Sequence, residues 1–142
     1  MTLDMTCIFC RIIAGEIPSR KVFESDHVLA FLDIGPLSEG HLLIIPKVHV
    51  SQLVDLPDAD AAELGRVVPR LGRALLSVTG SDGLNLLVNN GASAGQEVMH
   101  CHWHLIPRVS GDDLGYRWLA GNYPEGRIDE LAEAYRSALA PS

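Results

Sequence analysis

The sequence predicts a single α+β domain organised around an antiparallel sheet. The chain has 142 residues, of which 47% are hydrophobic, which is enough for one core. Short runs of β-branched and aromatic residues are separated by brief turn-like connections, a pattern typical of strands paired as hairpins. Two longer stretches have helical spacing. No G-x-G-x-x-G or GK[ST] motif follows a strand, so a doubly wound parallel sheet is disfavoured.

The first third of the chain is predicted to form one helical turn and three strands. The turn lies in CIFCRIIAGEIPS and ends at Gly15 and Pro18, which interrupt a helix. Asp26 and His27 separate the first two strands and indicate a hairpin. The three strands are KVFES, VLAFLD and HLLIIP, at residues 21–25, 28–33 and 41–46.

A long helix is expected between Pro57 and Gly80. Asp60 followed by Glu63 resembles a capping box at its start. Pro69 lies inside the stretch and removes a backbone hydrogen bond, so we expect a bend near residues 67–68. The apolar residues at helical spacing are Leu64, Val67, Val68, Leu71, Leu75 and Val78.

The last third is predicted to contain two strands and a short amphipathic helix. A strand at 84–90 leads through the glycine-rich turn 89–96 into a returning strand at 98–109, and the helix covers 127–139. We assign residues 1–142 to one domain, with the motifs in about 7–108 and a C-terminal segment at 109–142. The aromatic residues of that segment are expected to cover an apolar face or a subunit interface; they are Tyr116, Trp118 and Tyr123.

Composition argues against several classes of partner. The formal net charge is −7, whereas a duplex-binding surface needs clustered Lys and Arg to displace counterions. The N-terminus lacks the basic and apolar regions of a signal peptide, and no apolar run approaches the roughly 18 residues of a membrane span. We therefore expect a cytoplasmic protein that binds neither a nucleic acid polymer nor a membrane.

The stretch HCHWHLIPR places His100, His102 and His104 at every second position, in a chain with six histidines. In a strand these side chains would share one face, about 6 to 7 Å apart from one to the next. Cys101, Trp103 and Leu105 would then face the core. This pattern fits two hypotheses: a metal site built on two of the three histidines, or a nucleophilic imidazole flanked by imidazoles that bind charge.

Cys7-x-x-Cys10 bears on that choice. It supplies two of the four ligands that a structural zinc needs, although it could equally be a redox pair. With His49 and His100 it would make a closed Cys2His2 set. His102 and His104 would then be free, and a neutral imidazole can attack phosphorus to form an N–P bond that water later breaks. Donors for the phosphate oxygens are expected in NNGASAGQ, from backbone N–H groups and from Asn89, Ser93 and Gln96.

HCHWHLI resembles the His-φ-His-φ-His-φ-φ motif of the histidine triad (HIT) family of nucleotide hydrolases and transferases. CIFCRIIAGEIPS, VLAFLDIGPLSEGHLLIIPKVHV and NNGASAGQEVMHCHWHLIPR resemble the corresponding blocks of its nucleotide-binding branch, over about residues 7 to 108. The resemblance implies a five-stranded antiparallel sheet with one long and one or two shorter helices, and a homodimer. Zinc-bearing bacterial members have Cys-x-x-Cys and histidines at the positions of His49 and His100, which implies a structural zinc and no catalytic metal.

The resemblance also implies a site, residue by residue. The middle histidine of the motif is the nucleophile, which is His102 here, and His104 contacts the same phosphate. Asp33 is implied to accept hydrogen bonds from the ribose hydroxyls of an AMP-like ligand, with Ile34 beside it. The residues implied to enclose the base are Ile8, Phe9, Ile12, Phe31 and Leu32, and those implied to contact the phosphates are Asn89, Gly95, Gln96 and Glu97.

Glu97 departs from many eukaryotic members, which have Ser or Thr there, and its carboxylate would repel a phosphate unless it points away or handles a leaving-group proton. The resemblance implies an enzyme that cleaves a nucleoside monophosphate, AMP, from phosphoramidates, acyl adenylates or dinucleoside polyphosphates. Two alternatives are a nucleotide-binding regulatory protein with residual hydrolysis, and a metallohydrolase that combines the histidines with Asp112 or Asp113.

Overall fold

The computed structural model describes residues 2–115 and 119–141. It has a five-stranded antiparallel sheet with strand order β1-β2-β3-β5-β4, which confirms the predicted fold class. The strands are β1 (Lys21–Glu24), β2 (Val28–Leu32), β3 (Leu42–Pro46), β4 (Gly83–Val88) and β5 (Trp103–Arg108). The helices are α1 (Ile8–Ile13), α2 (Asp58–Thr79) and α3 (Arg127–Leu139), with single 3₁₀ turns at Leu53–Asp55 and Ala92–Ala94.

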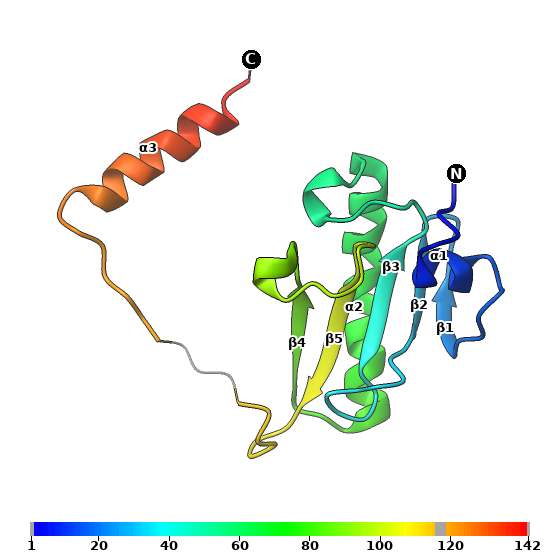
Figure 1. The fold of residues 1–142 in the computed structure, drawn as a ribbon. Coiled ribbons are helices and arrows are strands. Elements are labelled where there is room, and N and C mark those ends of the chain that lie inside the picture. Colours follow the sequence, from blue (N-terminus) through cyan, green and yellow to red (C-terminus); the bar gives the residue numbers. More distant parts are fainter. Residues whose placement is uncertain (1, 116–118, 142) are drawn as a thin grey trace.

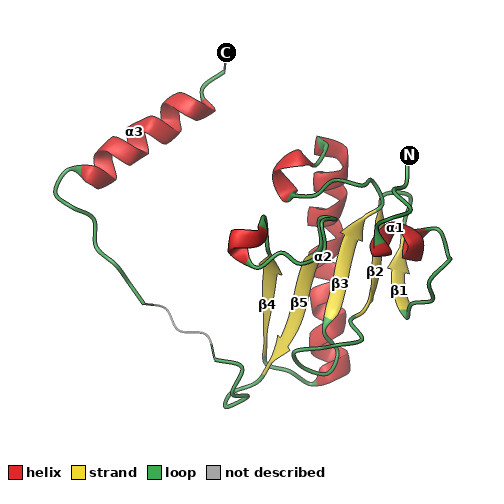
Figure 2. Cartoon of the chain, viewed as in Figure 1, coloured by secondary structure: helices red, strands yellow, loops and turns green. Residues whose placement is uncertain are grey.

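The two faces of the sheet are covered by different helices (Figure 1). The long helix α2 packs on one face, where its Leu64, Val67, Leu71 and Leu75 meet Leu105 and other strand residues. The short helix α1 lies on the opposite face, over the β2 and β3 side of the sheet (Figure 2). Alternate side chains of a strand face opposite sides, so the residues of β5 divide between these two layers.

The start of α2 differs from the predicted capping box. The helix begins at Asp58, Pro57 is the N-cap residue, and no side chain caps it. Asp60 lies inside the first turn, where its carboxylate is 3.0 Å from Nδ1 of His27, and Glu63 pairs with Arg66 instead. The prediction was wrong because aspartates in a first turn are favoured by the helix dipole as well as by capping. The helix continues through Pro69, and the expected bend stays a prediction.

The strand predicted at residues 98–109 is shorter than expected. β5 begins at Trp103, so only His104 of the three histidines is a strand residue, and residues 100–102 belong to the loop that leads into it. The alternation of faces still holds, because Trp103 and Leu105 pack against the α2 cluster, whereas His102 and His104 line a cavity on the other face. β5 lies between β3 and β4, and His104 is paired with Leu43 on one side and Leu87 on the other.

The C-terminal helix α3 stands away from the sheet in Figure 1, and none of its residues is buried. Ile128, Tyr135 and Leu139 on this helix are exposed, as is Tyr123 before it. Tyr116 and Trp118, the other aromatics of the predicted cover, lie outside the described residues. In the part of the chain that the structure describes, no helix has the length and apolar character needed to cross a lipid bilayer.

Candidate functional site

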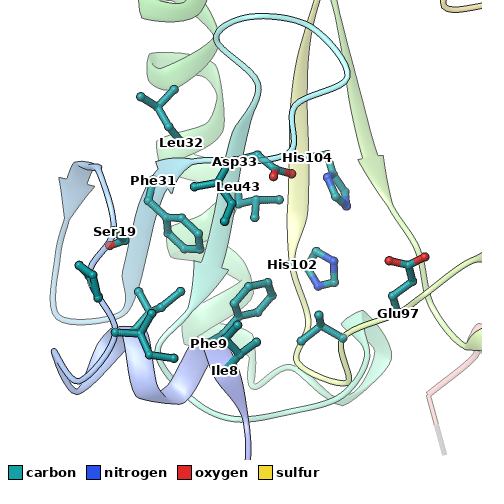
Figure 3. Close-up of a pocket in the computed structure, with 15 residues that line it drawn as sticks. Ile8, Phe9, Ser19, Phe31, Leu32, Asp33, Leu43, Glu97, His102 and His104 are labelled. Atoms are coloured by element: carbon teal, nitrogen blue, oxygen red, sulfur yellow. The ribbon is translucent and has the colours of Figure 1, made fainter.

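A cavity of about 290 Å³ opens on the α1 face of the sheet (Figure 3). Helix α1 forms one wall, the end of β2 another, and His102 and His104 lie at the far side. All the residues predicted to hold a base and ribose line it: Ile8, Phe9, Ile12, Phe31, Leu32, Asp33 and Ile34. The sequence did not identify five further lining residues, which are Ile17, Pro18, Ser19, Leu43 and Val98.

The apolar wall is partly rigid core. Phe9, Ile12, Phe31 and Leu43 belong to one buried cluster, and the Phe9 and Phe31 rings meet edge to face at a centroid distance of 5.9 Å. Ile34, by contrast, is not part of this buried cluster, because 90% of its surface is exposed. The cavity therefore combines a fixed floor with an apolar rim residue that a ligand would cover.

His102 is 8% exposed, and its position is set by Phe9 and by the backbone. The Phe9 ring lies edge-on to it at 5.1 Å between centroids. Nδ1 of His102 lies 2.7 Å from the carbonyl oxygen of His100. A carbonyl oxygen only accepts, so Nδ1 carries the ring proton and Nε2 of the neutral ring has a free lone pair. The backbone contact thus leaves Nε2 as the ring nitrogen of His102 that is available to a ligand.

His104 lies beside His102, with 5.0 Å between the ring centroids. Burial, with a smaller contribution from the His102 and His41 rings, lowers the pKa of His104 to about 4. It is therefore neutral near pH 7. Its Nδ1 is 2.9 Å from Nε2 of His41, a buried histidine that the sequence did not single out. Only the pairing of β3 with β5 brings these two rings together, and that register was not predictable from spacing.

A second hollow, of about 280 Å³, continues from the histidines toward the loop after β4. Three of the predicted phosphate contacts line it: Asn89, Gly95 and Glu97. Gly95 has a φ of +91°, in the left-handed region that favours glycine. Asp33 borders both hollows, and its Oδ1 accepts a hydrogen bond from the N–H of Gly35 at 2.8 Å.

Gln96 does not line either hollow. Its side chain is 4% exposed and bridges two loops: Oε1 accepts from the N–H of Gly91, and Nε2 donates to the carbonyls of Ser51 and Val98. The backbone N–H groups of Gly95 and Gln96 donate to Ala92 and Gly91. In this structure the expected donors therefore hold the loop in shape. A side-chain amide that is buried and fully bonded is a structural element, which composition alone could not reveal.

Cys7, Cys10, His49 and His100 come together as predicted, with ligand atoms within 4.8 Å of one another. Sγ of Cys7 is 3.4 Å from Nδ1 of His100, Sγ of Cys10 is 3.4 Å from Nδ1 of His49, and the two Nδ1 atoms are 3.2 Å apart. Around a tetrahedral zinc with Zn–S of about 2.3 Å and Zn–N of about 2.05 Å, a sulfur and a nitrogen ligand lie about 3.6 Å apart and two nitrogen ligands about 3.4 Å apart. The donor set therefore fits such an ion.

His100 connects this group to the histidine triad. Its ring is fully buried, and Nε2 lies 2.8 Å from the carbonyl oxygen of Pro46. Nε2 thus donates, which leaves the Nδ1 lone pair directed at the cysteines, the tautomer that a metal ligand needs. Burial lowers the pKa of His100 to about 4, so the ring is neutral. Its own carbonyl is the acceptor for His102.

The aspartates of the metallohydrolase alternative do not join the histidines. Both carboxylate oxygens of Asp112 pair with Arg108, at 2.6 and 2.8 Å, beyond the far end of β5. The Arg108 guanidinium holds the pKa of Asp112 well below its usual range. A different acidic group lies close to the triad, since Asp33, His41 and His104 have ligand atoms within 4.8 Å of one another.

A buried imidazole beside a second imidazole, in the motif His-φ-His-φ-His-φ-φ on a five-stranded antiparallel sheet, is the arrangement of a histidine triad protein. The HIT domain model matches residues 14–111 of this chain. The chain belongs to the HIT family.

Known relatives extend along nearly the whole chain. It is 44% identical over 139 residues to "Protein hit" of Bacillus subtilis, with 96% of each chain covered. It is 44% identical over 140 residues to adenosine 5'-monophosphoramidase HNT1 of Saccharomyces cerevisiae, covering 98% of this chain and 84% of the relative. Adenylylsulfatase HINT3 of Arabidopsis thaliana is 50% identical over 113 residues, covering 80% of this chain and 57% of HINT3.

Two solved structures share the fold. A HIT family protein of Bacillus subtilis superposes with a TM-score of 0.90 at 42% identity, over 96% of this chain and 99% of that one. A zinc-bound histidine triad family protein of Mycobacterium smegmatis superposes with a TM-score of 0.74 at 36% identity, over 96% and 99% of the two chains.

Proposed function

We propose that this protein is a nucleotide hydrolase or transferase that releases a nucleoside monophosphate, AMP, from a phosphoramidate, acyl adenylate or dinucleoside polyphosphate. The observation that carries the proposal is the contact of His102 Nδ1 with a backbone carbonyl, which leaves Nε2 as the reactive nitrogen, at the end of an apolar cavity bordered by Asp33. The cavity has the chemistry to take a base and ribose. The names of the relatives, a monophosphoramidase and an adenylylsulfatase, support this substrate class.

In the proposed reaction the base lies between Ile8, Phe9 and Phe31, and Asp33 accepts from the ribose hydroxyls. Nε2 of His102 attacks the α-phosphorus, an N–P bond forms, and the bond from phosphorus to the leaving group breaks as that group takes up a proton from solvent. Water then attacks phosphorus and the N–P bond breaks. The water proton passes to solvent, the neutral imidazole is regenerated, and the nucleoside monophosphate is released. His104 stabilises the charge that develops on the phosphoryl oxygens.

We also propose that Cys7, Cys10, His49 and His100 hold a structural zinc. Bound there, zinc would supply a tetrahedral crosslink between the N-terminal turn and the approach to β5. No step of the proposed reaction uses it, because the reacting nitrogen is on His102. The zinc-bound relative from Mycobacterium smegmatis supports this choice of metal.

The first experiment measures turnover of an adenosine phosphoramidate and AMP affinity in wild type and in His102→Ala. We expect His102→Ala to lose at least about 10³-fold in kcat while AMP binds within a few-fold of wild type. Full activity in the variant would refute the nucleophile. A wild-type rate no better than that of the variant would support a nucleotide-binding regulatory protein instead.

A further inference from the structure

His41 lies directly before β3 and has no part in the mechanism above. Its side chain is 2% exposed, and both of its ring nitrogens have partners. Nδ1 lies 3.1 Å from the backbone nitrogen of Leu37, and Nε2 lies 2.9 Å from Nδ1 of His104. A buried imidazole that is bonded at both nitrogens is fixed in orientation.

The contact at Nδ1 determines where His41 carries its proton. A backbone N–H can only donate, so Nδ1 of His41 accepts, and the ring proton is on Nε2. A second proton would have to enter at the occupied Nδ1, and burial, which lowers the pKa of His41, also opposes it. Asp33 is the charged group that faces this ring, with Oδ2 3.7 Å from Nε2, and it offsets only part of the effect of burial.

The contact with His41 also determines where His104 carries its proton. Nε2–H of His41 donates to Nδ1 of His104, so Nδ1 of His104 is an acceptor and carries no proton. The proton of the neutral His104 ring is therefore on Nε2. No described residue is hydrogen-bonded to that nitrogen, and the ring borders both hollows of the site. His104 is thus left with an N–H group for a ligand.

We propose that His41 is a positioning residue that fixes His104 in its Nε2–H tautomer, so that His104 donates to a nonbridging oxygen of the reacting phosphoryl group. The identity of that acceptor rests on the proposed function. The tautomer does not, because it follows from contacts within the free protein. Leu37, His41 and His104 form one chain of donors and acceptors that begins at a backbone N–H.

This arrangement gives two adjacent rings opposite chemistry. His102 donates from Nδ1 to a backbone carbonyl and keeps a lone pair on Nε2, whereas His104 accepts at Nδ1 and keeps a proton on Nε2. In the proposed complex, the lone pair on Nε2 of His102 faces the phosphorus, and the N–H on Nε2 of His104 faces a phosphoryl oxygen. An unconstrained neutral imidazole populates both tautomers, and the Nδ1–H form of His104 would direct a lone pair at a negatively charged oxygen.

The direct test is an NMR measurement on the full-length, metal-loaded protein without substrate. Two-bond ¹H–¹⁵N spectra of ¹⁵N-labelled protein separate protonated from unprotonated ring nitrogens. We expect protonated Nε2 and unprotonated Nδ1 on both His41 and His104, and the reverse pattern on His102. A protonated Nδ1 on His104 in the wild type would overturn the proposal, whatever the protein hydrolyses.

Two variants of His41 separate positioning from simple packing. In His41→Asn the side-chain oxygen can still accept from Leu37, but the amide ends short of His104. In His41→Gln the amide nitrogen can reach Nδ1 of His104 and donate to it. We expect His41→Asn to populate the Nδ1–H form of His104 and to lose at least about tenfold in kcat with KM within about threefold, as a missing oxyanion donor would.

His41→Gln is expected to keep the Nε2–H form and most of the wild-type kcat. His27→Gln is the matched control, because His27 is half exposed and its ring contacts Asp60 at the start of α2, away from the cavity. His27→Gln should change neither the tautomer of His104 nor kcat. Equal kcat losses in His41→Asn and His41→Gln, with the tautomer of His104 unchanged in both, would show that His41 only packs and would refute the proposal.

Discussion

The three histidines of the triad are spaced evenly in the sequence but differ in what their Nδ1 atoms contact. Nδ1 of His100 faces two cysteines, Nδ1 of His102 faces a carbonyl, and Nδ1 of His104 faces another histidine. The chemical role of each histidine is therefore decided by the atom that its Nδ1 contacts. The alternation predicted the shared face, but the partners are side chains 63 to 93 positions away in the sequence or a backbone carbonyl, which spacing does not encode.

The depressed pKa of His104 gives a prediction about acid stability. A histidine in the unfolded chain has a pKa of about 6.5, whereas the folded value is about 4. Between these values the unfolded chain binds a proton that the folded chain does not, so stability present above about pH 6.5 is lost as the pH falls toward 4. His102, His41 and Asp33 are the groups that face this ring.

We therefore expect urea unfolding to show a larger loss of stability between pH 7 and pH 5 in wild type than in His104→Gln. The comparison between the two proteins removes the contributions that they share, including metal loss. An identical loss in both would contradict the assignment of a neutral His104.

At the scale of elements, apolar periodicity predicted α2 and the five strands well, because each has one face against a buried cluster. The ends of elements were less predictable. Asp60 and Glu63 have the residue types of a capping box, yet the helix already begins at Asp58. β5 begins only at Trp103, after His100 and His102. Loops that serve a site are shaped by contacts such as those of Gln96, which involve no periodic pattern.

Pro69 gives a prediction for α2. It is exposed, within a helix that continues on both sides of it, so it removes one backbone hydrogen bond without contributing to the core. We expect Pro69→Ala to raise the free energy of unfolding by about 1–3 kcal/mol, given the helix cost of proline of about 3 kcal/mol. Chemical denaturation measures this, with Arg73→Ala at another exposed position of α2 as the control that should change little. A destabilised Pro69→Ala would show that the proline packs favourably.

For the molecule as a whole, the candidate metal site joins distant parts of the chain. Cys7 is the N-cap of α1 and Cys10 lies within that helix, His49 follows β3, and His100 precedes β5. We expect about one zinc per wild-type chain by elemental analysis, and much less in Cys7→Ser, with a fall of at least about 5 °C in the unfolding midpoint from loss of the crosslink. His102→Ala should keep its zinc. Equal zinc content in Cys7→Ser and wild type would refute the four-ligand site.

The C-terminal helix gives a prediction about assembly. α3 has 13 residues and no buried residue, and it exposes Ile128, Tyr135 and Leu139. An isolated helix of this length is marginal in water, so it needs an apolar partner surface. We expect the full chain to sediment as a homodimer and a chain ending before α3 to show weaker self-association. A monomer at micromolar concentration would contradict this expectation.

His100 links the candidate metal group to His102, and this link has a thermodynamic consequence. Its side chain belongs to the metal group, and its carbonyl orients His102. Any coupling between two such sites is reciprocal, because an effect of one ligand on the affinity of another must be returned in equal measure. If the proposed zinc orients the His102 ring, a nucleotide bound at His102 raises the affinity of the four ligands for zinc by the same factor. The proposed substrate would then help the protein to retain the proposed zinc.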